Sequence, residues 1–361
     1  MKPNHKTFAA VAVIAIVLAV APFVVGSHFG NAWVRTLDFA LLYVMLALGL
    51  NIVVGYAGLL DLGYIAFYAV GAYVYALLNS PHLAALLPAW MAHPSLWVVL
   101  PLGALLACIF GVLLGAPTLR LRGDYLAIVT LGFGEIIRLF LNNLDNPVNI
   151  TNGPKGISMI APVTVFGQPL SQKLNLFGFE IPGLYLYYYL FLALALLIML
   201  ISLRLQHSRI GRAWVAIRED EIAAAAMGIN TRNIKLLAFA MGASFGGVAG
   251  GLFAGFQGFV SPESFILMES VMVLCMVVLG GMGHIPGIIL GVVLLTLTPE
   301  LLRDAVIPLQ NQLWGKQLVD PETLRMLLFG LALILVMLLR PEGLWPSSRR
   351  KQEMHAAEDA A

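Results

Sequence analysis

Long apolar runs alternate with short polar segments along most of the chain, and this spacing predicts membrane-spanning helices. A helical span needs roughly 20 mostly apolar residues to cross the bilayer core. Ten runs approach or reach that length; they lie near 8–26, 36–56, 62–79, 96–116, 125–141, 184–203, 236–259, 267–282, 284–302 and 324–339. They are continuous and lack the period-two alternation of a transmembrane barrel. We therefore predict an all-α polytopic membrane protein with about ten spans, within a range of about eight to ten.

The composition agrees with a membrane protein. Hydrophobic residues make up 60% of the chain and charged residues 11%, whereas soluble domains carry about 25% charged residues. The formal net charge of +2 gives no indication of a nucleic-acid partner. The first run follows Lys2 and Lys6, is longer than a signal-peptide core and ends without a small-x-small cleavage site, so we expect it to be retained. The cell (inner) membrane is the predicted location.

The distribution of basic residues predicts the orientation of the spans. If the N-terminus is inside and ten spans alternate, 14 of the 21 lysine and arginine residues fall on inner segments and seven on the outer side. The positive-inside rule then places both termini in the cytoplasm. The largest inner segment is 204–235, and the longest outer segment is a periplasmic loop at 142–183. Residues 1–345 form the predicted transmembrane domain, and 346–361 form a polar cytoplasmic tail.

Ten spans can divide into two five-helix halves, and an odd number of spans in each half makes the second half run inverted. One local match supports such a repeat. The second span of the first half ends in "GYAG" (55–58), and the corresponding span of the second half ends in "GFQG" (255–258). Asp61 follows the first motif and Glu263 the second.

The segment "SRIGRAWVAIREDEIAAAAMGINTRNIK" (208–235) concentrates eight charged residues between two apolar runs. Four consecutive alanines favour helix, and we predict a short helix over 212–227. Gly228 is suited to the left-handed conformation that ends a helix. Asn230 or Thr231 can cap the helix that enters the next span.

The predicted short helix has two different sides. Trp214, Ile217 and Ile222 would form an apolar side, and Glu219, Asp220 and Glu221 a polar side. A solvated loop whose arginines only set the topology would explain the basic residues, but not a capped helix with clustered acids. We therefore predict a rigid docking helix for a cytoplasmic partner.

Several polar residues lie at membrane depth or at span ends. A charge at the centre of a span costs about 2.5–3.5 kcal/mol on insertion scales, so such residues usually face a bundle interior or a cavity. Glu135 and Arg138 are three residues apart and can form a structural ion pair. Asp61 is expected at an inner turn, where it can cap the next helix. The candidate pathway or gating residues are Asn51, Gly55, Gly58, Asp61, Glu135 and Gln257.

The chain lacks the Gly-x-x-x-x-Gly-Lys-[Ser/Thr] phosphate-binding motif. Energy would therefore come from a separate subunit, from an ion gradient or from neither. An ion-coupled carrier usually needs buried carboxylates. Glu135 stands out as the single convincing mid-span acid, and it has a cationic neighbour, which argues against such a carrier.

The pentapeptide "GASFG" (242–246), together with His284, invites an intramembrane serine protease. The same stretch is rich in glycine, and small residues commonly allow close packing between membrane helices. Packing is therefore preferred to catalysis. No histidine pair has metal-ligand spacing, and Cys108 and Cys275 lie inside apolar runs. The glycine-rich segment "GGMGHIPG" (280–287) should bend the chain. We predict no catalytic residue, metal or cofactor.

Six motifs, in this order and spacing, resemble the permease subunits of branched-chain amino-acid ABC importers, the LivM-like branch. They are "GLNIVVGYAGLLDLGYIAFYAVGAY" (49–73), "RGDYLAIVTLGFGEIIR" (122–138), "NITNGPKGI" (149–157), "IGRAWVAIREDEIAAAAMGIN" (210–230), "VVLGGMGHIPG" (277–287) and "LRPEGLW" (339–345). The resemblance covers about 49–345, nearly the whole chain.

The resemblance implies that the inner loop is the segment that docks on an ATP-hydrolysing subunit, called the EAA loop in ABC importers. Glu221 stands one residue further from Gly228 than in the general pattern, and no Ile-x-Leu-Pro follows. The residues assigned to this coupling role are Arg212, Arg218, Glu219, Glu221 and Gly228.

The implied partners are a second homologous permease, two cytoplasmic ATP-binding subunits, an external substrate-binding protein and the bilayer. The implied substrate is a branched-chain amino acid. Urea or another amino acid is the nearest alternative substrate, and an ion-coupled carrier and an intramembrane protease are the alternatives from other classes.

Overall fold

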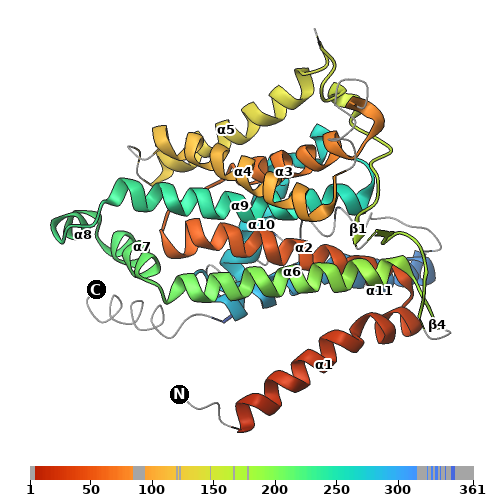
Figure 1. The fold of residues 1–361 in the computed structure, drawn as a ribbon. Helices are drawn as coiled ribbons and strands as arrows, with labels where there is room; N and C mark the ends of the chain where they lie inside the picture. Colours follow the sequence, from red (N-terminus) through yellow and green to blue (C-terminus); the bar gives the residue numbers. More distant parts are fainter. Residues whose placement is uncertain are drawn as a thin grey trace.

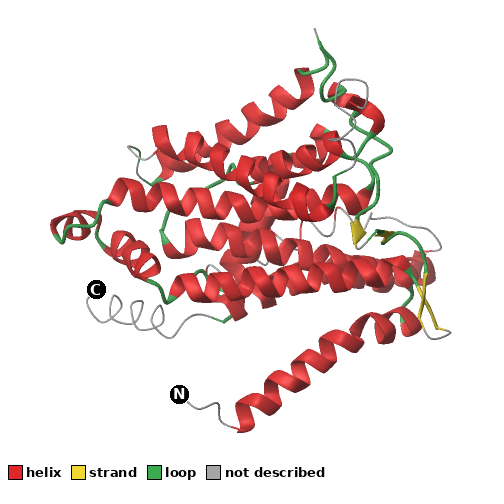
Figure 2. Cartoon of the chain, in the orientation of Figure 1, coloured by secondary structure: helices red, strands yellow, loops and turns green. Residues whose placement is uncertain are grey.

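The computed structural model describes residues 5–83, 94–118, 121, 123–146, 148–165, 167–176 and 179–314, with single positions from 323 to 345. Helices dominate this part of the chain (Figures 1 and 2). The helices are α1 (His5–His28), α2 (Asn31–Asn51), η1 (Ile52–Tyr56), α3 (Ile65–Leu78), η2 (Pro81–Leu83), α4 (Leu96–Thr118), α5 (Asp124–Asn143), η4 (Gly153–Lys155), α6 (Gly183–Gln206), α7 (Arg209–Glu219), α8 (Glu221–Ala226), α9 (Thr231–Gln257), η5 (Pro262–Phe265), α10 (Leu267–Gly280) and α11 (Ile285–Trp314).

The first nine predicted spans each coincide with a helix, namely α1–α6 and α9–α11. Six stretches are long and apolar enough to cross a membrane: Asn31–Tyr56, Leu96–Thr118, Gly183–Gln206, Thr231–Gln257, Pro262–Gly280 and Ile285–Asp304. The tenth predicted span, 324–339, lies largely outside the described residues. The chain is therefore an all-α polytopic membrane protein, as predicted, while the full number of spans stays a prediction.

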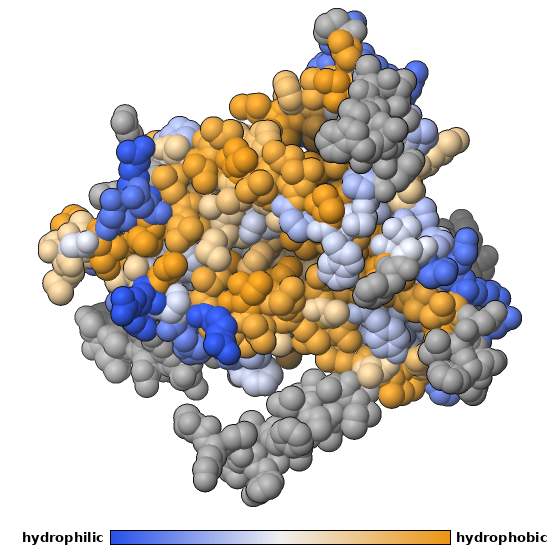
Figure 3. Space-filling view, viewed as in Figure 1, coloured by the Kyte–Doolittle hydropathy of each residue, from blue (hydrophilic) through white to orange (hydrophobic). Residues whose placement is uncertain are grey.

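The connections between the helices gather at two opposite ends of the bundle (Figure 1). At one end, the segment after η1, the N-terminus of α5 and helices α7 and α8 line a common cavity. At the other end, the amide of Ala161 donates to Asn79 O at 2.7 Å, and Ile157 pairs with Val260. Figure 3 shows an apolar belt between hydrophilic patches at the two ends. This is the surface expected of a bundle that crosses a bilayer.

The chain returns to the α7 end after α11. The amide of Leu344 donates to Leu279 O at 2.8 Å, and the amide of Trp345 donates to Gly280 O at 3.2 Å. Both acceptors belong to the last turn of α10.

The loop at 142–183 carries two short antiparallel pairs. They are β1 (Thr164–Val165) with β2 (Gln168–Pro169), and β3 (Leu174–Leu176) with β4 (Phe179–Ile181). Tyr187 ties this loop to the bundle, because its hydroxyl donates to Gly255 O and accepts from the Val163 amide, both at 3.1 Å.

Helix α9 lies at the centre of the core, where it packs against α2, α3 and α4. Its glycines make this possible. A Cβ added at Gly242 would lie 2.7 Å from Val53 Cγ2, and one at Gly247 would lie 2.6 Å from Ala107 Cβ. Ser244 donates to Met241 O within its own helix, at 2.7 Å. The close approach at Gly242 confirms the packing role predicted for 242–246. The Ser244 hydroxyl bonds to the backbone of its own helix.

Candidate functional site

The charged segment between α6 and α9 folds into two short helices at one end of the bundle (Figure 1). Ser208 caps α7 by accepting a hydrogen bond from the Gly211 amide at 3.1 Å. Gly228 follows α8 with a φ of +85°, and Asn230 caps α9 by accepting from the Asn233 amide at 3.1 Å. Both the predicted stop and the predicted cap are confirmed, so this segment has a defined shape.

The single helix predicted over 212–227 is wrong. The chain breaks at Asp220, which takes an extended conformation with a φ of −153°. Its carboxylate accepts from the amides of Ile222 and Ala223, at 2.8 and 3.0 Å. Capping a new helix satisfies amides that would otherwise lack a partner, so the alanines that follow still form helix, but in α8 and not in a continuation of α7.

The break also changes which side chains face the bundle. Trp214 is fully buried, and its indole Nε1 donates to Ile234 O at 2.7 Å. Ile217 is buried as well. Ile222, which was expected on the same apolar side, is 71% exposed. That part of the prediction is wrong because α8 starts in a new direction after Asp220.

A buried ion pair fastens α8 to α9. Lys235 Nζ lies 2.6 Å from Glu221 Oε1, and the Lys235 side chain is 7% exposed while that of Glu221 is 29% exposed. Glu221, predicted to couple to a partner, therefore turns toward its own bundle. Arg212 bonds within its own segment instead, donating to His207 O at 3.2 Å.

Arg218 brings the predicted coupling loop to the predicted pathway residues. Its Nη1 donates to Gly55 O at 2.6 Å. Gly58 has a φ of +69°, and a Cβ added there would lie 2.7 Å from Arg218 Cγ. One coupling candidate, Arg218, thus meets two pathway candidates, Gly55 and Gly58, at the end of α2.

The end of α2 is a π-helical turn, η1. Asn51 lies just before it, fully buried, and its Oδ1 accepts from the Gly283 amide at 2.8 Å. Gly283 belongs to the bend between α10 and α11, where Gly281 and Gly283 have φ values of +116° and +82°. The predicted bend over 280–287 is confirmed, and Asn51 connects it to η1.

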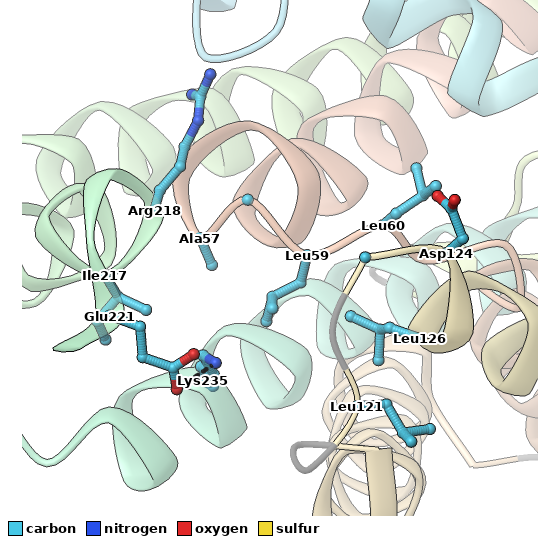
Figure 4. Close-up of a pocket in the computed structure, with 12 residues that line it drawn as sticks. Ala57, Leu59, Leu60, Leu121, Asp124, Leu126, Ile217, Arg218, Glu221 and Lys235 are labelled. Carbon is cyan, nitrogen blue, oxygen red and sulfur yellow. Dashed lines mark hydrogen bonds and ion pairs between the residues drawn. The ribbon is translucent and has the colours of Figure 1, made fainter.

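A cavity of about 220 Å³ opens between the segment after η1, the beginning of α5, helices α7 and α8, and the beginning of α9 (Figure 4). Its walls combine aliphatic side chains such as Leu59 and Leu126 with the charged side chains of Asp124, Glu221 and Lys235. Arg218 also lines it, but in Figure 4 its guanidinium points away from the Glu221–Lys235 pair. Helices α7 and α8 thus contact the bundle through Ile217, Arg218 and Glu221 but leave a space between themselves and the beginning of α5.

Asp61 lies near this end and is fully buried. Its Oδ1 accepts from the Gly63 amide at 2.9 Å, whereas α3 has no side-chain cap. Asp61 therefore caps the turn before α3 and not α3 itself, since α3 begins only at Ile65, four residues after Asp61. Burial raises the pKa of its carboxyl to about 7, although the Gly63 hydrogen bond acts in the opposite direction.

Glu135 and Arg138 form the predicted ion pair on α5, with Arg138 Nε donating to Glu135 Oε1 at 3.0 Å. Arg138 also lies 3.1 Å from Glu263 in η5. The acid that follows "GFQG" therefore contacts α5. At the other end of α5, the Leu62 amide donates to Thr130 Oγ1 at 3.0 Å, so the segment around Asp61 contacts this helix too.

Gln257 lies apart from the other candidates, at the opposite end of α9. Its Oε1 accepts from Arg35 Nη2 at 2.7 Å. The Arg35 guanidinium also lies over the rings of Phe39 and Phe256, at 5.8 and 5.4 Å. The structure thus separates Gln257 from Asn51, although the sequence had grouped them.

The sequence analysis missed Asp38. This residue lies in α2, is fully buried, and neither carboxyl oxygen has a hydrogen-bond partner among the described residues. Glu135 is therefore not the single mid-span acid. The signal that could have identified Asp38 was its position inside the predicted span at 36–56, in the first turn of that span. Among the described residues, no three His, Cys, Asp or Glu side chains gather in a way that could hold a metal ion.

Fold and site together define a multi-pass α-helical membrane protein with a structured helical loop at one end. The sequence pattern described as branched-chain amino acid transport system / permease component matches residues 32–337. The chain belongs to this permease family.

Individual relatives agree with this assignment. The chain is 46% identical to the high-affinity branched-chain amino acid transport system permease protein LivM of Escherichia coli (strain K12), over 93% of this chain and 75% of the relative. It is 44% identical to LivM of Salmonella typhimurium, over 95% and 76%. Its identity to the permease protein LivH of Escherichia coli (strain K12) is 28%, over 84% and 90%. No solved structure matches the chain.

Proposed function

We propose that this chain is the permease subunit of an ATP-driven importer and forms half of the translocation pathway for branched-chain amino acids. The 46% identity to LivM over 93% of the chain carries this proposal. The structured loop of α7 and α8 supports it, because a capped and anchored pair of short helices can receive force from another protein. Catalysis and ATP hydrolysis are assigned to partner subunits.

The proposed assembly contains a second homologous permease, two cytoplasmic ATP-binding subunits and an external substrate-binding protein, in the cell (inner) membrane. The ATP-binding subunits dock on 208–235 and on the equivalent loop of the second permease. The binding protein delivers solute on the side of the 142–183 loop. When ATP draws its binding subunits together, α7 and α8 move and the inner ends of the spans change position.

The proposed topology has ten spans, an inverted repeat of two five-helix halves and both termini in the cytoplasm. Two observations support it. Residues 344 and 345 bond to the α10 end, on the α7 side of the bundle. Gly58 and Gly258, the last residues of the two repeat motifs, have φ values of +69° and +71° and end helices at opposite ends of the bundle. The domain of 1–345 and the polar tail of 346–361 complete this proposal, and the tail lies outside the described residues.

The pathway is proposed to run along α5. Glu135 and Arg138 have side chains that are 39% and 21% exposed. Ionised side chains within a span usually face a cavity or another protein, because exposure to lipid is costly. The candidates Asn51, Gly55, Gly58 and Asp61 then lie at its inner end, and Gln257 at its outer end.

Uptake by the reconstituted transporter tests this function. Proteoliposomes containing the chain, a second permease, the ATP-binding subunits and the binding protein should accumulate labelled leucine with internal ATP, and unlabelled isoleucine or valine should compete. Urea should not compete. If the proteoliposomes accumulated urea and not leucine, the proposed substrate class would be overturned.

An ion-coupled carrier is the alternative from another class, since such carriers usually need buried carboxylates and Asp38 is buried. The permease relatives give it no support. The same vesicles separate the two. Leucine uptake that needs ATP and continues with an ionophore supports the ATP-driven importer, whereas uptake that needs an ion gradient and no ATP supports the carrier.

A further inference from the structure

Two distant segments hold the short helix η1 at the end of α2. Arg218 of α7, which lies 163 positions further along the chain, donates to Gly55 O. The Gly283 amide, 232 positions from Asn51, donates to Asn51 Oδ1 just before η1. One short element therefore contacts both the charged loop and the bend between α10 and α11.

The contact with Arg218 satisfies a general need of helix ends. The last carbonyls of a helix have no partner within it. In η1 the chain uses wide turns, with the Ala57 amide on Ile52 O at 3.1 Å and the Leu59 amide on Val53 O at 3.0 Å. Gly55 O accepts from the Arg218 guanidinium, and a positive charge at a helix C-terminus is also favoured by the helix dipole. A charge-assisted bond of 2.6 Å is among the stronger hydrogen bonds of a protein.

Glycines allow the three segments to approach this closely. A Cβ at Gly55 would lie 2.8 Å from the Gly283 amide nitrogen, and one at Gly58 would lie 2.7 Å from Arg218 Cγ. At the same point Gly283 faces the loop, because a Cβ there would lie 3.8 Å from Arg218 Nη1. We name this meeting of η1, Arg218 and the 281–284 bend the η1 junction.

We propose that Arg218 is a positioning residue that transmits movement of α7 through the η1 junction to α2 and, by way of Asn51, to the bend between α10 and α11. This inference rests on the proposed function. Helix α7 is anchored by the buried Trp214 and moves as a unit with Arg218 near its C-terminal end. The π-helical turn is the element that yields, since such turns are wider than an α-helix and often mark functional sites.

The test compares Arg218→Gln with Arg303→Gln in the complete transporter. Arg303 lies on α11, outside the charged loop and the η1 junction, and pairs with Glu300 of the same helix at 2.6 Å. The quantity measured is solute taken up per ATP hydrolysed. Arg218→Gln should lower this ratio about tenfold while ATP hydrolysis continues, because the charge-assisted bond to η1 is lost. Arg303→Gln should leave the ratio close to the wild-type value.

Amide hydrogen exchange over residues 52–60 gives a second readout. In the wild-type transporter, a non-hydrolysable ATP analogue should change the exchange of this segment, and in Arg218→Gln that response should disappear. An Arg218→Gln transporter that keeps both the ratio and the exchange response overturns the proposal. If Arg218→Gln does not assemble, Arg218→Met, which also removes the charged donor, is measured in the same way, and an unchanged ratio overturns the proposal there.

The outcomes also separate this inference from the proposed function. Wild-type uptake without the ATP-binding subunits would overturn the function itself. Wild-type uptake that depends on ATP, together with an Arg218→Gln variant that couples equally well, would overturn the η1 junction alone.

Discussion

Removal of the Lys235 charge should destabilise the protein more than removal of any exposed lysine. Lys235 is buried and pairs with Glu221 at 2.6 Å, so Lys235→Met removes the ammonium group that faces the Glu221 carboxylate beside the core. Breaking a fully buried pair costs about 3–5 kcal/mol. The Glu221 side chain is 29% exposed, and water can solvate part of the remaining charge. We therefore expect a loss of about 2 kcal/mol, below the range for a fully buried pair.

The assay is thermal unfolding of the purified protein in detergent. The unfolding entropy is about 2.1 cal/mol/K per residue near the midpoint, so in a chain of 361 residues 1 kcal/mol shifts the midpoint by about 1.3 °C. Lys235→Met should therefore lower it by about 3 °C. The matched control is Lys173→Met. Lys173 pairs with Glu180 at 2.9 Å, but the two side chains are 69% and 64% exposed. Solvent screens that pair, and its loss should leave the midpoint unchanged.

The double variant Lys235→Met/Glu221→Gln completes the experiment. Because it removes both charges, it should be more stable than Lys235→Met alone. Equal midpoints for Lys235→Met and Lys173→Met would refute the reasoning. So would a double variant whose loss of stability exceeds the sum of the losses in Lys235→Met and Glu221→Gln.

Two further predictions concern the core. Gly242→Ala should lower the unfolding midpoint because its Cβ would lie 2.7 Å from Val53 Cγ2. Gly132→Ala should be neutral or stabilising, because among the described residues no atom outside its own helix backbone and chain neighbours lies within 4 Å of the added Cβ. The reverse order would contradict the packing argument. Asp38→Asn should leave the midpoint unchanged or raised, since neither Asp38 oxygen has a described partner and a neutral side chain costs less at membrane depth. A lower midpoint would indicate that the ionised carboxylate has a partner in the folded protein.

The positions of the helices were predictable because membrane spans obey a local rule. Each span must satisfy its own backbone hydrogen bonds and present about 20 apolar residues. The predicted run at 184–203 therefore became α6, Gly183–Gln206, without help from the rest of the chain. The stop at Gly228 and the cap at Asn230 were predictable for the same reason, since both depend on residues within one turn.

The break at Asp220 shows the limit of this local reasoning. The alanines after it favour helix, and the sequence pattern alone supports one helix through 212–227. Whether Asp220 continues that helix or caps a new one depends on where each helix must point to bury its side chains. The burial of Trp214 and the Lys235–Glu221 pair settle that question in three dimensions.

The candidate residues were thus chosen from the sequence, but their grouping was decided by the tertiary structure. Composition, apolar run length and turn residues established a polytopic helical membrane protein with a charged, capped loop, because these features act within a few residues. The bond from Arg218 to Gly55, the bond from Gly283 to Asn51 and the separation of Gln257 depend on contacts across 163, 232 and 222 positions. Such contacts form only when helices pack, since packing alone determines which distant side chains reach the unpaired groups at a helix end.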